Sequence, residues 1–214
     1  DSILNGELAY ETRQRLGAEV FREHPVDADI VVGIPDSSTP HAVGLAAAAK
    51  IPYAEAIIRN RYVGRTFIQP DQRSREQGVQ TKFNPMRGVI EGKRLLVVDD
   101  SIVRSTTITR VIKMLRRAGA KEIHVRVASP PIKSTCHFGV DMATLGELIA
   151  ANKTVEEITE YIGADSLAYL SVKGLLKAVR APENSYCTGC FTGNYPIPVQ
   201  LEMNKMSLEV AQNT

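Results

Sequence analysis

Hydrophobic positions along the chain alternate between helical spacing and short continuous runs. Apolar side chains spaced three to four residues apart predict an amphipathic helix over residues 7–22. A β-branched run over residues 28–34 predicts a buried strand, and after a polar turn the alanine-rich residues 42–50 predict a second helix. This order of strand, loop and helix is typical of an α/β unit.

The same order recurs further along the chain. Residues 94–98 and 122–130 read as buried strands, with a helix over residues 105–117 between them and a short strand at residues 51–54 before them. A further helix is predicted at residues 172–180. Alternating strands and helices predict an α/β fold, a mostly parallel central sheet flanked by helices, with ligands at the carboxyl ends of the strands.

Two segments lack this regularity. The polar stretch over residues 59–85 is long for a loop in a compact domain, which predicts a flexible lid over a site. Residues 181–214 are rich in Pro, Asn and Gly around a CTGC motif, a composition that predicts an extended tail. We expect residues 1–180 to form one domain.

Composition narrows the possible partners and compartment. A net charge of +2, from 26 basic and 24 acidic residues, gives no reason to expect a nucleic-acid partner. No apolar run is long enough to cross a membrane, and the N-terminal residues do not resemble a signal peptide, so we expect a cytoplasmic protein. Because the chain begins with Asp1 in place of Met, we also expect a fragment of a longer protein.

The chemistry concentrates in the segment LLVVDDSIVRSTT, residues 95–107. A buried strand delivers two adjacent carboxylates, Asp99 and Asp100, to the edge of the sheet, where unpaired charge is costly and a cationic or hydroxyl-rich partner is needed. The hydroxyls and backbone N–H groups that follow lie at the start of a helix, which suits a phosphate.

This segment resembles the phosphoribosyl pyrophosphate signature of type I phosphoribosyltransferases, in the form VDDSIVR typical of amidophosphoribosyltransferases. RNRYVGRTFIQP (residues 59–70) and the late CTGCFTG resemble the same family, so the similarity spans nearly the whole chain. It implies a type I phosphoribosyltransferase fold and a Mg²⁺-dependent enzyme of purine biosynthesis. Such an enzyme transfers ammonia to C1 of phosphoribosyl pyrophosphate and yields 5-phosphoribosylamine and pyrophosphate.

The resemblance also implies residue roles. Asp99 and Asp100 are expected to hold the ribose hydroxyls and, with Ser37, Mg²⁺. Ser105 stands where the family more often has glycine, which either crowds the phosphate or adds a hydroxyl contact. Taken alone, the segment DSSTP (residues 36–40) is also typical of an ordinary helix N-terminal cap. The full set of expected substrate-binding residues is Asp36, Ser37, Ser38, Asp99, Asp100, Ser101, Val103, Arg104, Ser105, Thr106 and Thr107.

The expected lid carries cations that suit phosphate oxygens. An arginine-rich stretch is ordinarily a solvated loop, but the resemblance implies a lid that closes over pyrophosphate and seals a path for ammonia. Arg59 belongs to the same stretch. The residues given catalytic roles here are Arg61, Tyr62, Arg65 and Lys82, with Tyr62 expected to line the ammonia path.

The three cysteines, Cys136, Cys187 and Cys190, leave several interpretations open. They can be reduced and unliganded, or form a zinc site with His137, although adjacent Cys and His are poorly placed to bind one ion. By resemblance they ligate a structural 4Fe-4S cluster, whose fourth cysteine is missing from this sequence.

The resemblance finally implies parts that these residues lack. The family enzyme has an N-terminal glutaminase domain that supplies ammonia from glutamine, forms a homo-oligomer and is inhibited by purine nucleotides. Two alternatives remain: a regulator that senses phosphoribosyl pyrophosphate without turnover, and a salvage phosphoribosyltransferase acting on a nucleobase. His41, His124 and His137 belong to no motif that needs a general base and are expected to be packing or surface residues.

Overall fold

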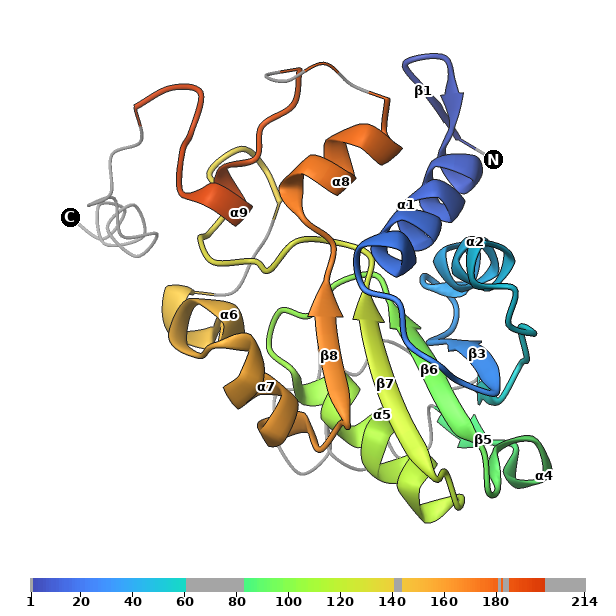
Figure 1. Ribbon diagram of the computed structural model, residues 1–214. Coiled ribbons are helices and arrows are strands. Elements are labelled where there is room, and N and C mark those ends of the chain that lie inside the picture. Colours follow the sequence, from blue (N-terminus) through green and yellow to red (C-terminus); the bar gives the residue numbers. More distant parts are fainter. Residues whose placement is uncertain (1, 61–82, 141–143, 181, 183–184, 199–214) are drawn as a thin grey trace.

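The computed structural model describes residues 2–60, 83–140, 144–180, 182 and 185–198. Its centre is a parallel sheet of four strands, which confirms the predicted α/β architecture (Figure 1). The strand order across this sheet is β3 (Ile30–Gly33), β6 (Arg94–Asp99), β7 (Glu122–Val127) and β8 (Ser166–Tyr169). All pairs are in register, so neighbouring side chains project from the same face.

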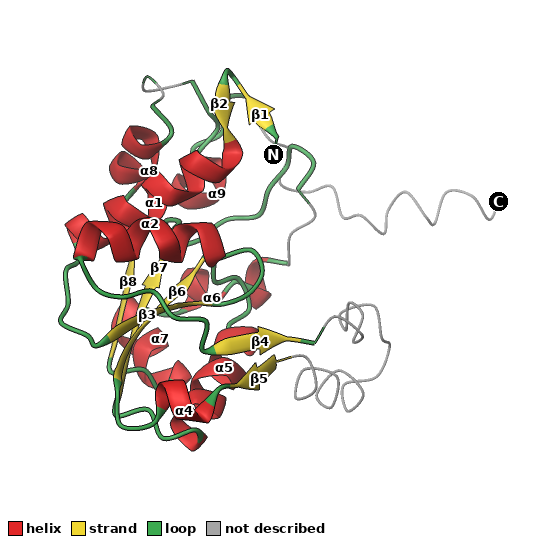
Figure 2. Cartoon of the chain, turned by 90° about the vertical axis from the view of Figure 1, so that its right-hand side faces the viewer, coloured by secondary structure: helices red, strands yellow, loops and turns green. Residues whose placement is uncertain are grey.

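Helices cover both faces of the sheet (Figures 1 and 2). One face packs against α1 (Ala9–Glu23), α2 (Thr39–Ala49) and α8 (Val172–Ala178) around Val31, Leu96 and Val98. The other face packs against α5 (Thr106–Arg117) and α7 (Val155–Ile162), with the short helices α4 (Arg87–Ile90) and α6 (Ile149–Asn152) beside them. Burial of both faces explains why the strands read as continuous apolar runs.

Helices α1 and α2 approach backbone to backbone. A Cβ atom at Gly17 would lie 1.8 Å from the His41 carbonyl oxygen, and one at Gly44 would lie 2.0 Å from that of Gln14. Only glycine tolerates such a distance, because any side chain would clash with backbone atoms. This contact fixes α2, and with it the loop over residues 34–38 that enters the helix.

Two small pairs of strands lie outside the main sheet. At the N-terminus β1 (Ile3–Leu4) pairs antiparallel with β2 (Glu7–Leu8). Elsewhere β4 (Ile57–Arg59) pairs antiparallel with β5 (Phe83–Pro85), which brings together the two ends of the segment expected to form a lid (Figure 2). Residues 61–82 of that segment lie outside the described residues.

The structure differs from the sequence prediction at the ends of several helices and strands. Residues 7–8 form β2 rather than the first turn of α1, and α2 begins at Thr39, before the alanine-rich run. The strand predicted at residues 51–54 is only a single bridge between Tyr53 and Val31, because Pro52 has no N–H to extend the ladder. In the predicted extended tail, α9 (Gly189–Thr192) forms one helical turn. A short 3-10 turn, η2 (Leu145–Glu147), precedes α6.

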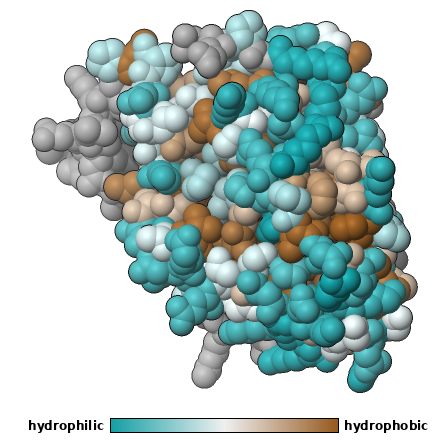
Figure 3. All heavy atoms as spheres, viewed as in Figure 1, coloured by the Kyte–Doolittle hydropathy of each residue, from teal (hydrophilic) through white to brown (hydrophobic). Residues whose placement is uncertain are grey.

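The outer surface is mostly polar on the side shown in Figure 3, with apolar side chains gathered in a band across its middle. Among the helices of the described segments, none is long and apolar enough to cross a bilayer.

Candidate active site

The candidate site lies where two neighbouring parallel strands end. Gly33 of β3 pairs with Val98 of β6, and Ile34 N donates to Val98 O at 3.0 Å. The loop over residues 34–38 and the loop over residues 100–105 therefore leave the sheet side by side. This register agrees with the sequence prediction that the acidic pair lies at the carboxyl edge of the sheet, where ligands bind in such folds.

A hydrogen-bond network joins the two loops through the acidic pair. Ser38 Oγ donates to Asp99 Oδ1 at 3.1 Å, and the N–H of Asp100 donates both to Ser38 Oγ at 3.1 Å and to Asp99 Oδ1 at 3.0 Å. Ser38 is fully buried and Asp99 is 7% exposed, whereas Ser37 is exposed. Of the two adjacent serines, Ser38 is thus the one that contacts the acidic pair.

Burial and the neighbouring Asp100 carboxylate raise the pKa of Asp99 well above its ordinary value. The hydrogen bonds from Ser38 and the Asp100 N–H act in the opposite direction but do not offset the burial. Two carboxylates held this close favour a bound cation, because a cation removes the repulsion between them. Their oxygens are the ligand type that Mg²⁺ prefers.

The loop after the acidic pair leads into α5 through Ser105. This residue has a φ of 60° and a ψ of −9°, the left-handed conformation that favours glycine, and it is 6% exposed. Its carbonyl accepts hydrogen bonds from the N–H of Thr109 at 3.0 Å and from Thr109 Oγ1 at 2.9 Å. Ser105 therefore occupies a backbone position that suits glycine better than serine.

The other residues expected in this loop divide by exposure. Ser101 is half-buried, while Thr106 and Thr107 are exposed at the first turn of α5, where helical N–H groups and the helix dipole favour an anion. Arg104 lies on the outside and forms an ion pair with Glu147, Nε to Oε1 at 3.2 Å. Val103 O accepts a hydrogen bond from Ile149 N at 3.0 Å, which anchors the loop to α6.

On the opposite side, Asp36 pairs with Arg59, Nη1 to Oδ2 at 2.6 Å. Arg59 ends β4, so this ion pair connects the β4–β5 hairpin to the loop over residues 34–38. The residues predicted to act from the lid, namely Arg61, Tyr62, Arg65 and Lys82, lie outside the described residues.

The structure adds His41 to this region, a residue expected from the sequence to be a packing or surface residue. It is 5% exposed on α2 and hydrogen-bonds the backbone of Ser37. Burial lowers the pKa of His41 to about 4, so the ring is neutral at physiological pH. The expectation that His41 is a packing residue is correct as to its burial, but the contact with Ser37 had no signal in the sequence.

Buried side-chain atoms without a hydrogen-bond partner gather around the same edge. Within the described segments these atoms are His41 Nδ1, Arg59 Nε and Tyr169 Oη. His41 contacts Ser37, Arg59 pairs with Asp36, and the Asp99 carboxylate acts on the pKa of Tyr169. Buried polar groups are nearly always paired, so each of these three residues is of interest for the site.

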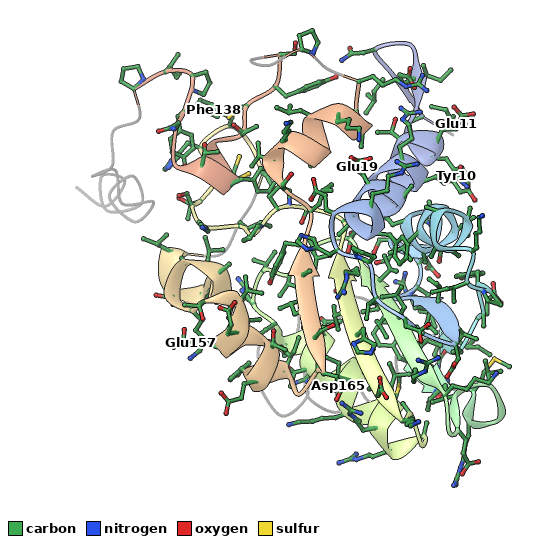
Figure 4. All side chains as sticks on the ribbon, in the orientation of Figure 1. Tyr10, Glu11, Glu19, Phe138, Glu157 and Asp165 are labelled. Atoms are coloured by element: carbon green, nitrogen blue, oxygen red, sulfur yellow. The ribbon has the colours of Figure 1, made fainter. Side chains whose placement is uncertain are left out.

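The three cysteines come from two segments that meet in the structure: Cys136 follows β7, and Cys187 and Cys190 belong to the tail. All are free, and burial raises the pKa of Cys190, with further increases from Cys136 and Cys187. The tail is docked by other contacts: Lys133 N and Ser134 N donate to Cys190 O, and Tyr195 Oη donates to Thr135 O at 2.6 Å. Phe138 lies in the same region (Figure 4).

No group of three or more His, Cys, Asp or Glu side chains is arranged to hold a metal ion among the residues that the structure describes. The three thiols are near enough for Cys136 and Cys187 to raise the pKa of Cys190, but they do not by themselves form a metal-ligand set. The zinc site with His137, left open by the sequence, has no such arrangement in these segments either.

Comparison with known proteins now gives the family. Residues 1–131 match the phosphoribosyl transferase domain. The amidophosphoribosyltransferases of Synechococcus elongatus and Bacillus subtilis are 50% and 52% identical over 211 and 203 residues. These alignments cover 98% and 93% of this chain but 43% of each relative.

A solved structure agrees with these relatives. Glutamine phosphoribosylpyrophosphate amidotransferase from B. subtilis, complexed with ADP and GMP, superposes with a TM-score of 0.86 at 50% identity, covering 95% of this chain and 46% of that one. The chain thus spans less than half the length of the relatives it matches. Both the resemblance to amidophosphoribosyltransferases and the type I fold predicted from the sequence are confirmed, and the chain belongs to the phosphoribosyl transferase domain family.

Proposed function

We propose that this chain is the phosphoribosyltransferase part of an amidophosphoribosyltransferase. In this role it binds phosphoribosyl pyrophosphate with Mg²⁺ and transfers ammonia to C1, giving 5-phosphoribosylamine and pyrophosphate. The observation that carries the proposal is the network of Ser38, Asp99 and Asp100, which holds two carboxylates at a sheet edge beside the start of α5. The similarity to amidophosphoribosyltransferases supports the choice of acceptor.

The two ends of the site suit the two ends of the substrate. Carboxylate oxygens of Asp99 and Asp100 accept hydrogen bonds from the ribose hydroxyls. Backbone N–H groups and hydroxyls over residues 101–107 receive the 5′-phosphate at the start of α5, where the helix dipole adds to the attraction. The loop over residues 36–38 faces the pyrophosphate side, next to the Arg59 guanidinium.

The oxygen-rich set around the acidic pair fits Mg²⁺, since this ion favours carboxylates together with substrate phosphates. Asp99 and Asp100, with Ser37, are the residues that would hold it. When bound, the ion neutralises charge on the leaving pyrophosphate.

The reaction needs no protein nucleophile. As pyrophosphate departs, positive charge develops at the anomeric carbon and negative charge on the leaving group, so fixed cations on the pyrophosphate side lower the barrier. Asp99 and Asp100 orient the sugar through its hydroxyls, and the phosphate loop fixes its other end. Positioning of this kind converts attack by ammonia into an effectively unimolecular step. Arg61, Tyr62, Arg65 and Lys82 are proposed to close the site from the lid.

For the cysteines we propose a structural 4Fe-4S cluster in the full-length protein. In its favour, Cys136, Cys187 and Cys190 are close enough to raise the pKa of Cys190, and thiolates are the usual ligands of such clusters. A 4Fe-4S cluster needs four thiolates, and the sequence given has three cysteines, so these residues alone do not complete the ligand set. Iron and sulfide content of the anaerobically purified full-length protein tests this: about four irons per chain support it, and a stable iron-free protein overturns it.

The remaining proposals concern the whole protein. Glutamine is proposed as the ammonia source through a glutaminase domain, with purine nucleotides as feedback inhibitors, because a relative is known in complex with ADP and GMP. We also propose that the full-length protein forms a homo-oligomer and is located in the cytoplasm.

The acceptor distinguishes this function from its alternatives. Pyrophosphate release from phosphoribosyl pyrophosphate and Mg²⁺ is measured with ammonium chloride and, separately, with a panel of nucleobases. Release that depends on ammonium supports the proposal. Release with a nucleobase alone would indicate a salvage enzyme, and tight binding without release with any acceptor would indicate a sensor.

A further inference from the structure

Tyr169 carries a buried hydroxyl that the proposed function does not use. It is the last residue of β8 and is 6% exposed, and its hydroxyl lacks a hydrogen-bond partner within the described segments. It also lies beyond residue 131, where the match to the phosphoribosyl transferase domain ends. No motif in the sequence draws attention to it.

The register of the sheet places Tyr169 on the side of the site opposite the β3 loop. Asp99 pairs with Val127, and Val127 pairs with Tyr169, so the three side chains share one face of the sheet. Two strand spacings separate the Cα atoms of Asp99 and Tyr169 by roughly 10 Å. Burial and the Asp99 carboxylate both raise the pKa of Tyr169, as expected for a phenol close to this charge.

The surroundings of Tyr169 connect it to the phosphate loop. Its ring belongs to the apolar cluster that contains Ile102 and Ile149. Ile102 lies within the loop after the acidic pair, and Ile149 N donates to Val103 O at 3.0 Å. The ring of Tyr169 is therefore anchored in the same apolar core that supports the phosphate loop.

A hydroxyl in this position is unfavourable for folding alone. Burying it without a partner costs about 1–3 kcal/mol, whereas phenylalanine would provide the same packing without that cost. The group becomes favourable only when a partner arrives. An acceptor of the proposed site on the same face of the sheet is the Asp99 carboxylate, whose Oδ1 already receives bonds from Ser38 and Asp100.

We propose that Tyr169 is a positioning residue: its hydroxyl donates to the Asp99 carboxylate, directly or through one bridging water, when phosphoribosyl pyrophosphate is bound, and so keeps that carboxylate aimed at the sugar. This inference rests on the proposed function. A phenol can act in this way without leaving the core, because water-mediated bonds are nearly as favourable as direct ones.

The test is Tyr169→Phe, with Tyr161→Phe as the control because Tyr161 is 59% exposed on α7. Two quantities are measured for each: the melting temperature without ligand, and the Kd for phosphoribosyl pyrophosphate with Mg²⁺ by titration calorimetry. For Tyr169→Phe we expect an unchanged or higher melting temperature and a Kd about 3–10 times higher, equivalent to one hydrogen bond. Tyr161→Phe should leave both quantities unchanged.

The outcomes separate the inference from the proposed function. If wild type binds and Tyr169→Phe binds equally well, the positioning role is wrong and the proposed function stands. If Tyr169→Phe loses affinity only in proportion to a lower melting temperature, the hydroxyl is structural and the inference is again wrong. If wild type does not bind phosphoribosyl pyrophosphate, the proposed function fails and the inference fails with it.

Discussion

Ser38 and Asp99 are 61 positions apart in the chain, and Ser38 Oγ donates a 3.1 Å hydrogen bond to Asp99 Oδ1. The same hydroxyl accepts a bond from the N–H of Asp100. One buried serine therefore connects the loop that follows β3 with both residues of the acidic pair. It sets the distance between the two loops that are proposed to hold opposite ends of the substrate.

Replacement of Ser38 by alanine should damage both stability and binding. It removes the donor to Asp99 and the acceptor of the Asp100 N–H, which then keep only each other as partners. Loss of these two hydrogen bonds should cost about 1–3 kcal/mol in the free energy of unfolding. Ser37→Ala is the comparison, since Ser37 is exposed and should affect Mg²⁺ and substrate binding only. Urea denaturation and titration calorimetry measure the two effects. Equal stability of the two variants would contradict the role given to Ser38.

Asp100→Asn should reduce catalysis far more than folding. The substitution keeps the backbone N–H that bonds Ser38 and Asp99 and removes only a negative charge. We expect a fall in kcat/KM for pyrophosphate release of about 100-fold or more, the scale typical of losing one electrostatic group from an active site. The melting temperature should remain within a few degrees of wild type. Unchanged release of pyrophosphate would show that the acidic pair has been misassigned.

Ser105→Gly should stabilise the protein. At a φ of 60°, a residue with a Cβ atom is strained by about 1–2 kcal/mol, and glycine relieves this at an entropic cost of about 0.5–1 kcal/mol. The expected net gain is about 0.5–1 kcal/mol in the free energy of unfolding. Ser105→Ala is the matched control: it also removes the hydroxyl but keeps the strained Cβ, and should gain nothing. A gain of similar size in both variants would mean that the hydroxyl, and not the backbone, is the source of the cost.

Glu19 provides a prediction about the helices that support the site. It lies on α1 on the side facing α8, with its side chain 8% exposed (Figure 4). Lys177 Nζ bonds Oε1 at 2.5 Å and Arg22 bonds Oε2 at 2.8 Å. Burial by itself raises the pKa of Glu19, but these two partners outweigh it and the net pKa is lowered.

Glu19→Gln should therefore lower stability by about 1 kcal/mol, because the buried carboxylate loses its charge-assisted bonds to Lys177 and Arg22, whose own side chains are largely exposed. With a lowered folded-state pKa, the contribution of Glu19 is fully present above the ordinary value of 4.5 and is lost as the pH falls through the folded-state pKa. The difference between wild type and Glu19→Gln should accordingly shrink at acid pH. Glu11→Gln, at an exposed position of the same helix, is the control. A difference independent of pH would contradict this account.

The sequence predicted the central sheet well because its strands carry an unambiguous pattern. Residues 95–98 are apolar on both faces, as expected for a strand buried between two helical layers, and the acidic pair lies at the end of this strand, at the edge of the sheet. The helix ends were less predictable. Pairing of β1 with β2 decides where α1 begins, and the local signal for that hairpin is the Asn5-Gly6 turn, in which both residues have a positive φ. The helical spacing over residues 7–22 concealed this signal.

Contacts between distant segments were not predictable from local patterns. Ser37 and Ser38 look equivalent in the sequence, and only the approach of β3 and β6 makes Ser38 the buried partner of Asp99. His41 and Tyr169 have no motif, and their unpaired atoms become visible only when packing is known. The left-handed backbone of Ser105 likewise becomes visible only in the structure.

The central claim is that the edge formed by these two loops transfers phosphoribosyl groups to ammonia. Phosphorus NMR of the wild-type chain with phosphoribosyl pyrophosphate, Mg²⁺ and ammonium chloride identifies the products directly. We predict that signals of pyrophosphate and of 5-phosphoribosylamine grow together, and only when all three reagents are present. Pyrophosphate release that is unaffected by ammonium, or an intact substrate after prolonged incubation with a folded chain, would contradict the account.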